Sequence, residues 1–128
     1  MVFCVQWTSK KVSNESIMQL AEKVKGVLRP SVVVETTESV LAFNPPDDRG
    51  ETFYVSAQDS GQFGCKTYTQ EYTVDVLRCL ILMVELDMAT QVFASADPGY
   101  LKELDYVNSV CKLSTYETQK AAFEMIHY

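Results

Sequence analysis

Hydrophobic positions are densest between residues 73 and 88, where a helix would be apolar on nearly every side. A helix of that kind has to be surrounded by other elements, so the pattern predicts a central buried helix. Only a narrow polar stripe could face water, and within it Asp75 and Arg78 are spaced to pair with each other. The stripe consists of Glu71, Asp75, Arg78 and Glu85, interrupted by Leu82. The side chains expected in the core are Leu77, Leu80, Ile81 and Val84.

A second helix is predicted between residues 14 and 28, because apolar residues recur there at three- and four-residue spacing. Ser13 or Asn14 can cap its start, since a short polar side chain accepts a hydrogen bond from the first turn of a helix. Arg29-Pro30 ends it, because a residue before proline avoids the helical conformation. The apolar face consists of Ile17, Leu20, Ala21, Val24, Val27 and Leu28.

Short runs rich in valine, phenylalanine and tyrosine predict strands in the rest of the first half. Residues 2–7 form an opening strand. Residues 32–34 and 40–43 are spaced as an antiparallel hairpin. The proline pair in residues 44–50 breaks regular structure. Residues 52–57 and 63–69 then predict two further strands that turn at residues 58–61 and run antiparallel.

After the central helix, residues 91–96 predict a short strand, residues 97–99 a turn, and the remainder two C-terminal helices. The last helix begins at a capping box, Ser114 to Glu117. Strands and helices do not alternate along the chain as they do in a doubly wound fold. We therefore expect an α+β fold: residues 1–128 as a single domain, with a mainly antiparallel sheet of about five to six strands packed by two main helices plus the two C-terminal helices.

Size and cysteine spacing favour one intracellular domain. With 128 residues and 47% hydrophobic composition, the chain can build its own core. Its four cysteines include no C-x-x-C pair, which favours free thiols in a reducing compartment. The first residues place apolar side chains before lysines, the reverse of a secretory signal, and no apolar run reaches membrane-spanning length. We expect a cytoplasmic protein without membrane attachment.

Charge is distributed unevenly along the chain, whose net charge is −6. Residues 1–30 hold five basic and two acidic side chains, whereas residues 31–128 hold six basic and fifteen acidic ones. An acidic surface repels a phosphate backbone, so direct nucleic-acid binding is not expected. Basic protein partners are the better match for this charge.

The segment Gly61–Thr67 ends in residue types found in phosphate-binding loops. In such a loop the lysine follows a glycine directly, so that it reaches the terminal phosphates. Here Cys65 separates Gly64 from Lys66. A hairpin turn is therefore the favoured interpretation, with weak phosphate-ligand binding as the alternative.

Cys65 is the best candidate for a reactive thiol, because the neighbouring Lys66 would favour its thiolate. The base would have to be His127, the only histidine, which lies next to the last residue. A hydrolase or transferase centred on these two residues is one alternative, and a half-buried strand cysteine is the other. A single histidine and the absence of ligand-spaced carboxylates predict no metal site, and we expect no cofactor.

Seven tyrosines and a stiffened loop point to a protein-binding surface. Tyrosine offers a large contact area at low entropic cost, and arginine is common in binding hot spots. The two prolines before Asp47 would reduce the entropy lost when the loop docks. The leading hypothesis is a small binding module or inhibitor with an acidic, tyrosine-bearing surface and no catalytic role. Its expected binding residues are Asp47, Asp48, Arg49, Tyr54, Tyr68 and Tyr72.

Overall fold

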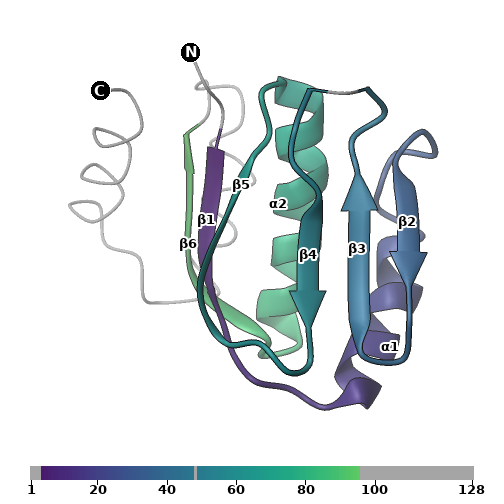
Figure 1. The fold of residues 1–128 in the computed structure, drawn as a ribbon, viewed down its shortest axis with the longest axis vertical. Helices are drawn as coiled ribbons and strands as arrows, with labels where there is room; N and C mark the ends of the chain where they lie inside the picture. Colours follow the sequence, from purple (N-terminus) through teal and green to yellow (C-terminus); the bar gives the residue numbers. More distant parts are fainter. Residues whose placement is uncertain (1–3, 48, 96–128) are drawn as a thin grey trace.

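The computed structural model describes residues 4–47 and 49–95, which form six strands and two helices (Figure 1). In chain order these are β1 Cys4–Ser9, α1 Asn14–Val24, β2 Val33–Thr36, β3 Val40–Asn44, β4 Phe53–Ser56, β5 Gly61–Lys66, α2 Gln70–Glu85 and β6 Ala89–Ser95. The predicted α+β class is confirmed. The two expected C-terminal helices lie outside the described residues.

The strands form two antiparallel three-stranded sheets, ordered β5-β1-β6 and β2-β3-β4. The predicted hairpin of β2 and β3 is confirmed, with Val34 opposite Phe43. β5 turns back beside β4, as expected, but its hydrogen-bonded partner is β1, with Val5 opposite Cys65 (Figure 1). β1 is thus a central strand, hydrogen-bonded on both edges.

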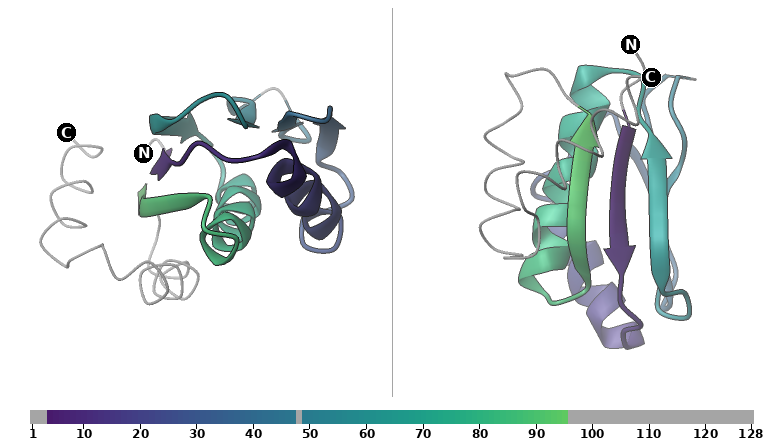
Figure 2. Two further views of the ribbon diagram at one scale, coloured as in Figure 1. Left: turned by 90° about the horizontal axis from the view of Figure 1, so that it is seen from below. Right: turned by 90° about the vertical axis from the view of Figure 1, so that its left-hand side faces the viewer.

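Both helices lie on one side of the strand layer (Figure 2). Leu77 and Leu80 of α2 are fully buried, as predicted, whereas Ile81 and Val84 are only partly buried against the core. Aromatic rings fill the space between the strands and α2. Trp7 stacks on Phe53 at a centroid distance of 5.0 Å, and further stacked or edge-on pairs join Phe53, Phe43 and Tyr72.

Ser13 is the N-cap of α1, and its hydroxyl accepts a hydrogen bond from the Ser16 amide at 3.2 Å. The helix ends at Val24, earlier than the apolar pattern suggests. Leu28 is nevertheless buried, because the segment after α1 continues across α2.

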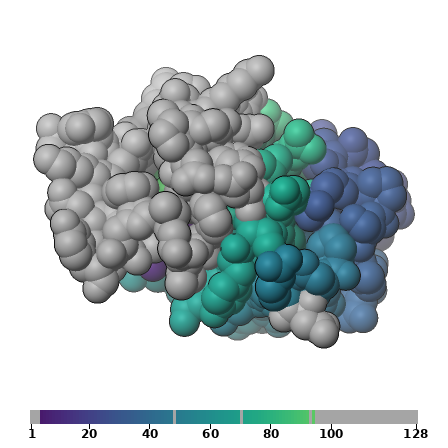
Figure 3. All heavy atoms as spheres, turned by 90° about the horizontal axis from the view of Figure 1, so that it is seen from above, coloured from purple at the N-terminus to yellow at the C-terminus, as the bar shows by residue number. Residues whose placement is uncertain are grey.

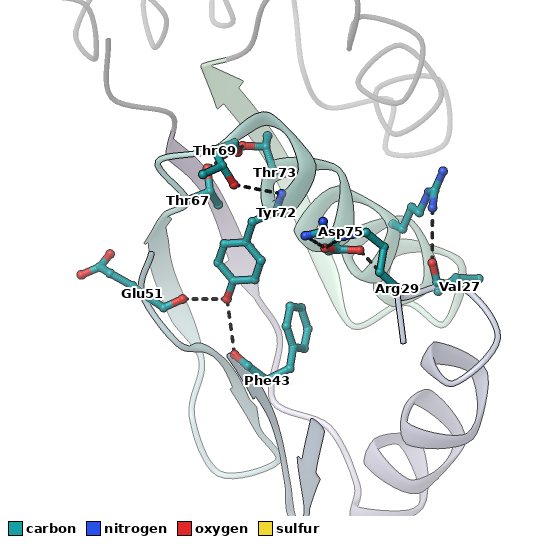
Figure 4. Close-up of polar contacts among 10 residues, drawn as sticks. Val27, Arg29, Phe43, Glu51, Thr67, Thr69, Tyr72, Thr73 and Asp75 are labelled. Carbon is teal, nitrogen blue, oxygen red and sulfur yellow. Dashed lines mark hydrogen bonds and ion pairs between the residues drawn. The ribbon is translucent and has the colours of Figure 1, made fainter. Parts of the chain in front are cut away.

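The prediction that Asp75 faces water and pairs with Arg78 is wrong. Asp75 is 1% exposed, and its Oδ2 lies 2.8 Å from both Nε and a terminal nitrogen of Arg29. The Arg29 amide also donates to Asp75 Oδ1 at 3.2 Å, while Arg78 donates to the Val27 carbonyl at 3.4 Å (Figure 4). The connection from α1 to β2 therefore covers part of the stripe that the helix pattern assigned to solvent.

Candidate functional site

The loop between β3 and β4 meets the junction between β5 and α2 at one end of the molecule (Figures 1 and 3). Two hydrogen bonds join them: the Glu51 amide donates to the Lys66 carbonyl at 2.8 Å, and the Lys66 amide donates to the side-chain oxygen Oε1 of Glu51 at 2.7 Å. We call five of the exposed residues around this joint the end surface. Its members are Asp47, Arg49, Lys66, Tyr68 and Glu71.

Tyr72, predicted to belong to the binding surface, is instead a core residue with no exposed area. Its hydroxyl donates to the Glu51 carbonyl at 2.6 Å and lies 3.3 Å from the Phe43 carbonyl (Figure 4). Burial raises the pKa of this phenol far above its ordinary value, with Cys65 adding to the effect. The hydrogen bond from Tyr72 to Glu51 therefore links the first turn of α2 to the loop, and the buried Tyr72 ring supports the residues of the end surface.

Gly50 is a residue of this site that the sequence alone did not single out. Its φ of +141° is a conformation that side-chain-bearing residues rarely adopt. A Cβ atom there would lie 3.0 Å from Tyr72 Cδ2, 3.1 Å from the Thr67 carbonyl oxygen and 3.2 Å from Pro45 Cγ. The loop therefore approaches the β5–α2 junction so closely that no side chain fits at position 50 without a shift of its neighbours.

We expect Gly50→Ala to lower the free energy of unfolding by about 1–3 kcal/mol, because it combines a strained φ with crowding against a backbone carbonyl. Gly26→Ala is the matched control, since its Cβ would lie 3.7 Å from the Lys23 carbonyl oxygen, an ordinary contact. Urea denaturation of both variants measures the difference. Equal stability of Gly50→Ala and wild type would contradict the close approach.

Tyr68 is the most unusual residue of the end surface. Its φ is +61°, which is uncommon for any residue other than glycine and strained for a bulky one. The Thr69 amide donates to the Thr67 carbonyl at 2.7 Å, so Tyr68 is the middle residue of a tight three-residue turn. Its side chain is 44% exposed. The turn thus presents an aromatic ring at the surface at a cost in backbone strain.

Three threonines hold this turn in place (Figure 4). Thr69 caps α2, accepting a hydrogen bond from the Tyr72 amide at 3.3 Å. The hydroxyls of Thr67 and Thr73, both buried, lie 2.5 Å apart, and the Thr73 hydroxyl also lies 2.7 Å from the Thr69 carbonyl oxygen. Because both neighbours of Tyr68 are fixed, the strained conformation at Tyr68 is maintained.

Asp47 and Arg49 give the loop its own internal structure. Asp47 Oδ1 accepts the Arg49 amide at 2.9 Å, and its Oδ2 lies 3.3 Å from the Arg49 guanidinium. The hydrogen bond from the Arg49 amide is the main cause that lowers the pKa of Asp47. The two side chains form an exposed pair of opposite charges on the end surface.

The other predicted binding residues are placed differently. Tyr54 is 41% exposed on β4, opposite Ala42 in the neighbouring strand, and so belongs to a sheet rather than to the loop. Asp48 lies outside the described residues, as does His127, the proposed base. From the predicted set, Asp47 and Arg49 thus lie on the loop, and Tyr68 lies on the β5–α2 junction that this loop contacts.

Cys65 is poorly placed for the reactivity that the sequence suggested. It points into the core from β5 and is 1% exposed. Burial is the main cause that raises its pKa to about 12, and the Glu51 carboxylate adds to the shift. The sequence suggested that the charge of Lys66 would favour the Cys65 thiolate. Neighbouring residues of a strand project to opposite faces, so the Lys66 side chain is directed away from the thiol. The thiol is therefore protonated at neutral pH.

We expect Cys65 and Cys79, both buried, to react with iodoacetamide only when the chain unfolds, and raising the pH from 7 to 9 should not change this. Burial also raises the pKa of Cys79 well above its ordinary value, while half-buried Cys4 should react before both Cys65 and Cys79. Peptide mapping after timed labelling measures the order, and the denatured chain without reductant should show four free thiols. Labelling of native Cys65 as fast as Cys4 would contradict its assigned burial.

The segment Gly61–Thr67 does not form a phosphate-binding loop. Residues 61–66 are strand β5, paired along their length with β1, and Thr67 is fully buried. A phosphate-binding loop requires consecutive backbone amides directed at the anion, whereas alternate amides of β5 face the neighbouring strand. The backbone geometry on which the phosphate-ligand alternative depended is therefore not found in this segment.

Two further observations concern possible ligands and membranes. Among residues 4–47 and 49–95, no group of three or more histidine, cysteine, aspartate or glutamate side chains could hold a metal ion. Neither α1 nor α2 combines the length and the apolar character that a bilayer-spanning helix needs, and this statement covers the same part of the chain.

Comparison with known proteins adds no assignment: no family model, no curated protein and no solved structure matches this chain.

Proposed function

We propose that this chain is a protein-binding module whose docking surface is the end surface. The observation that supports the proposal best is Tyr68, an exposed aromatic ring on a strained backbone. Strain of this kind persists where the surrounding structure enforces it, and it is concentrated at functional sites. Gly50, Tyr72 and three threonines enforce it here.

The end surface has the composition of a small binding hot spot. Tyr68 lies beside the loop that carries Arg49, and tyrosine and arginine are among the residue types most often found at hot spots. Asp47 and Glu71 carry negative charge, whereas Arg49 and Lys66 carry positive charge. This mixed surface suits a partner that presents groups of both signs around an apolar pocket for the Tyr68 ring. Cys65 is buried and protonated, so a cysteine-dependent reaction is not the function we propose.

Site-specific photo-crosslinking tests the proposal. Benzoylphenylalanine replaces Tyr68 in one sample and Met18 in the other, and each sample is irradiated in a lysate of cells that express the chain. Met18 is a matched control because it is 57% exposed and lies on α1, away from the end surface. We expect a discrete adduct from position 68 that excess wild-type chain suppresses. Identical adducts from both positions, or none from position 68, would contradict the proposal.

A pair of substitutions separates the ring of Tyr68 from its backbone strain. Tyr68→Gly should be more stable than Tyr68→Ala by about 1 kcal/mol, because glycine adopts φ near +61° without penalty. Neither variant should bind the partner identified by crosslinking, since both lack the tyrosine ring. Thermal melting and pull-down of the identified partner measure the two effects, and equal stability of the two variants would show that the backbone at Tyr68 is not strained.

A further inference from the structure

A hollow of about 320 Å³ lies over β5, β1 and β6, and its lining combines four uncharged polar residues with Trp7, Phe63 and Gly64. The three strands lie side by side in the right-hand view of Figure 2. The polar residues of the lining are Gln6 and Thr8 from β1, Gln62 from β5 and Gln91 from β6. Gly64 lies on β5 directly opposite Gln6. In a chain with 22% charged residues, none of the residues that line the hollow is charged.

Gly64 is not required by the fold. Its φ lies outside the left-handed region, and a Cβ atom would make only ordinary contacts, at 3.6 Å from Gln6 Cγ and 3.7 Å from the Val5 carbonyl oxygen. Glycine in a strand weakens it, and often marks a place where a ligand or another backbone approaches closely. Here the missing side chain keeps the hollow open.

Gln91 provides an independent sign of a built site. Its φ is +53° within β6, and the pairing of β1 with β6 shifts register between Gln6 and Thr8, which is a β-bulge. Bulges redirect side chains and are frequent beside binding sites. The Thr8 hydroxyl donates to Gln91 Oε1 at 3.0 Å and so fixes the Gln91 amide at the edge of the hollow.

We propose that this hollow binds an uncharged, extended peptide segment, with the glutamine amides hydrogen-bonding to its backbone. A primary amide carries a donor and an acceptor side by side, which is the complement of a peptide group. Within the described part of the chain, the Gln6 and Gln62 amides make no side-chain hydrogen bond, so both groups are available to a ligand. A charged ligand would find no counter-charge in the lining.

This site lies on a sheet face and uses none of the end-surface residues, so it goes beyond the proposed function and does not depend on it. Gly64→Ala should leave the yield of the crosslink from position 68 unchanged. Tyr68→Ala should leave binding of a peptide to the hollow unchanged. Failure of one proposal is therefore distinguishable from failure of the other.

The test uses the full ¹⁵N-labelled chain and N-acetyl-triglycine N-methylamide, a peptide backbone without side chains or charge. Titration should produce saturable NMR shifts of the side-chain amides of Gln6, Gln62 and Gln91 and of the Gly64 backbone amide. Gly64→Ala should weaken this binding by about tenfold, the equivalent of about one lost hydrogen bond, because its methyl group would lie beside Gln6 and hold the peptide away from the Gln6 amide. Its melting temperature should equal or exceed that of wild type.

Gly26→Ala is the control for a glycine change at a distance and should bind as wild type does. Maltotriose is titrated in parallel as a neutral polyol. Saturable shifts with maltotriose alone would overturn the proposal in favour of a carbohydrate site. Absence of saturable shifts with the peptide, or equal peptide binding by Gly64→Ala and wild type, would overturn it as well.

Discussion

Leu80→Ala is expected to lower the free energy of unfolding by about 2–5 kcal/mol, the sum of lost hydrophobic transfer and a cavity that the surroundings fill incompletely. Leu80 has no exposed area and lies in the middle of α2, which packs against α1, β1 and β6. For a domain of this size such a loss is a large part of the total stability. Urea denaturation monitored by circular dichroism measures it.

Ile81→Ala is the matched control for this experiment. Ile81 is the next residue of the same helix and loses a similar volume on truncation, but it is only partly buried. Its effect should be clearly smaller, since less apolar surface returns to water. If Leu80→Ala unfolds at the same urea concentration as wild type, α2 is not the centre of the core.

Arg29→Met is expected to cost about 3–5 kcal/mol, because it leaves the buried Asp75 carboxylate without its charge partner. Asp75 is 1% exposed and receives two guanidinium contacts at 2.8 Å. Methionine retains much of the apolar length of arginine, so the loss reports mainly on the charge. Equilibrium unfolding at neutral pH and moderate salt provides the value.

The double variant Arg29→Met/Asp75→Asn checks the cause. Asparagine removes the charge and keeps a side-chain oxygen that can accept a hydrogen bond from the backbone amide of residue 29. In the wild type this amide lies 3.2 Å from Asp75 Oδ1. The double variant should therefore be more stable than Arg29→Met alone. If it is equally unstable or less stable, the contribution of Arg29 comes from packing and not from pairing with Asp75.

Features encoded by neighbouring residues were predictable from the sequence. The spacing of Ile17, Leu20 and Val24 determines which face of α1 is buried, and Ser13 determines where it begins. The valine-rich runs determine β2 and β3, whose short connection leaves antiparallel pairing as the simple outcome. The surface position of the loop before Gly50 was also predictable, because prolines and charged residues favour an exposed, irregular segment.

The sequence did not indicate how distant segments meet. β5 follows β4 directly, yet it pairs with β1, which is more than fifty residues earlier in the chain. Such a pairing depends on the total apolar surface buried by the sheet and helices together, which no local pattern records. The same assembly turned Cys65 inward and removed the reactivity that Lys66 suggested.

Burial of polar side chains was likewise decided by the tertiary structure. On an isolated helix Asp75 belongs to a solvent-facing stripe, but in the protein the connection after α1 supplies Arg29 and makes its burial favourable. Tyr72 was expected at the surface, but in the core its hydroxyl has hydrogen-bond acceptors in the carbonyl groups of Phe43 in β3 and Glu51 in the loop. A sequence records the hydrogen-bonding capacity of a side chain, whereas its partners, and so the environment it can occupy, exist only after folding.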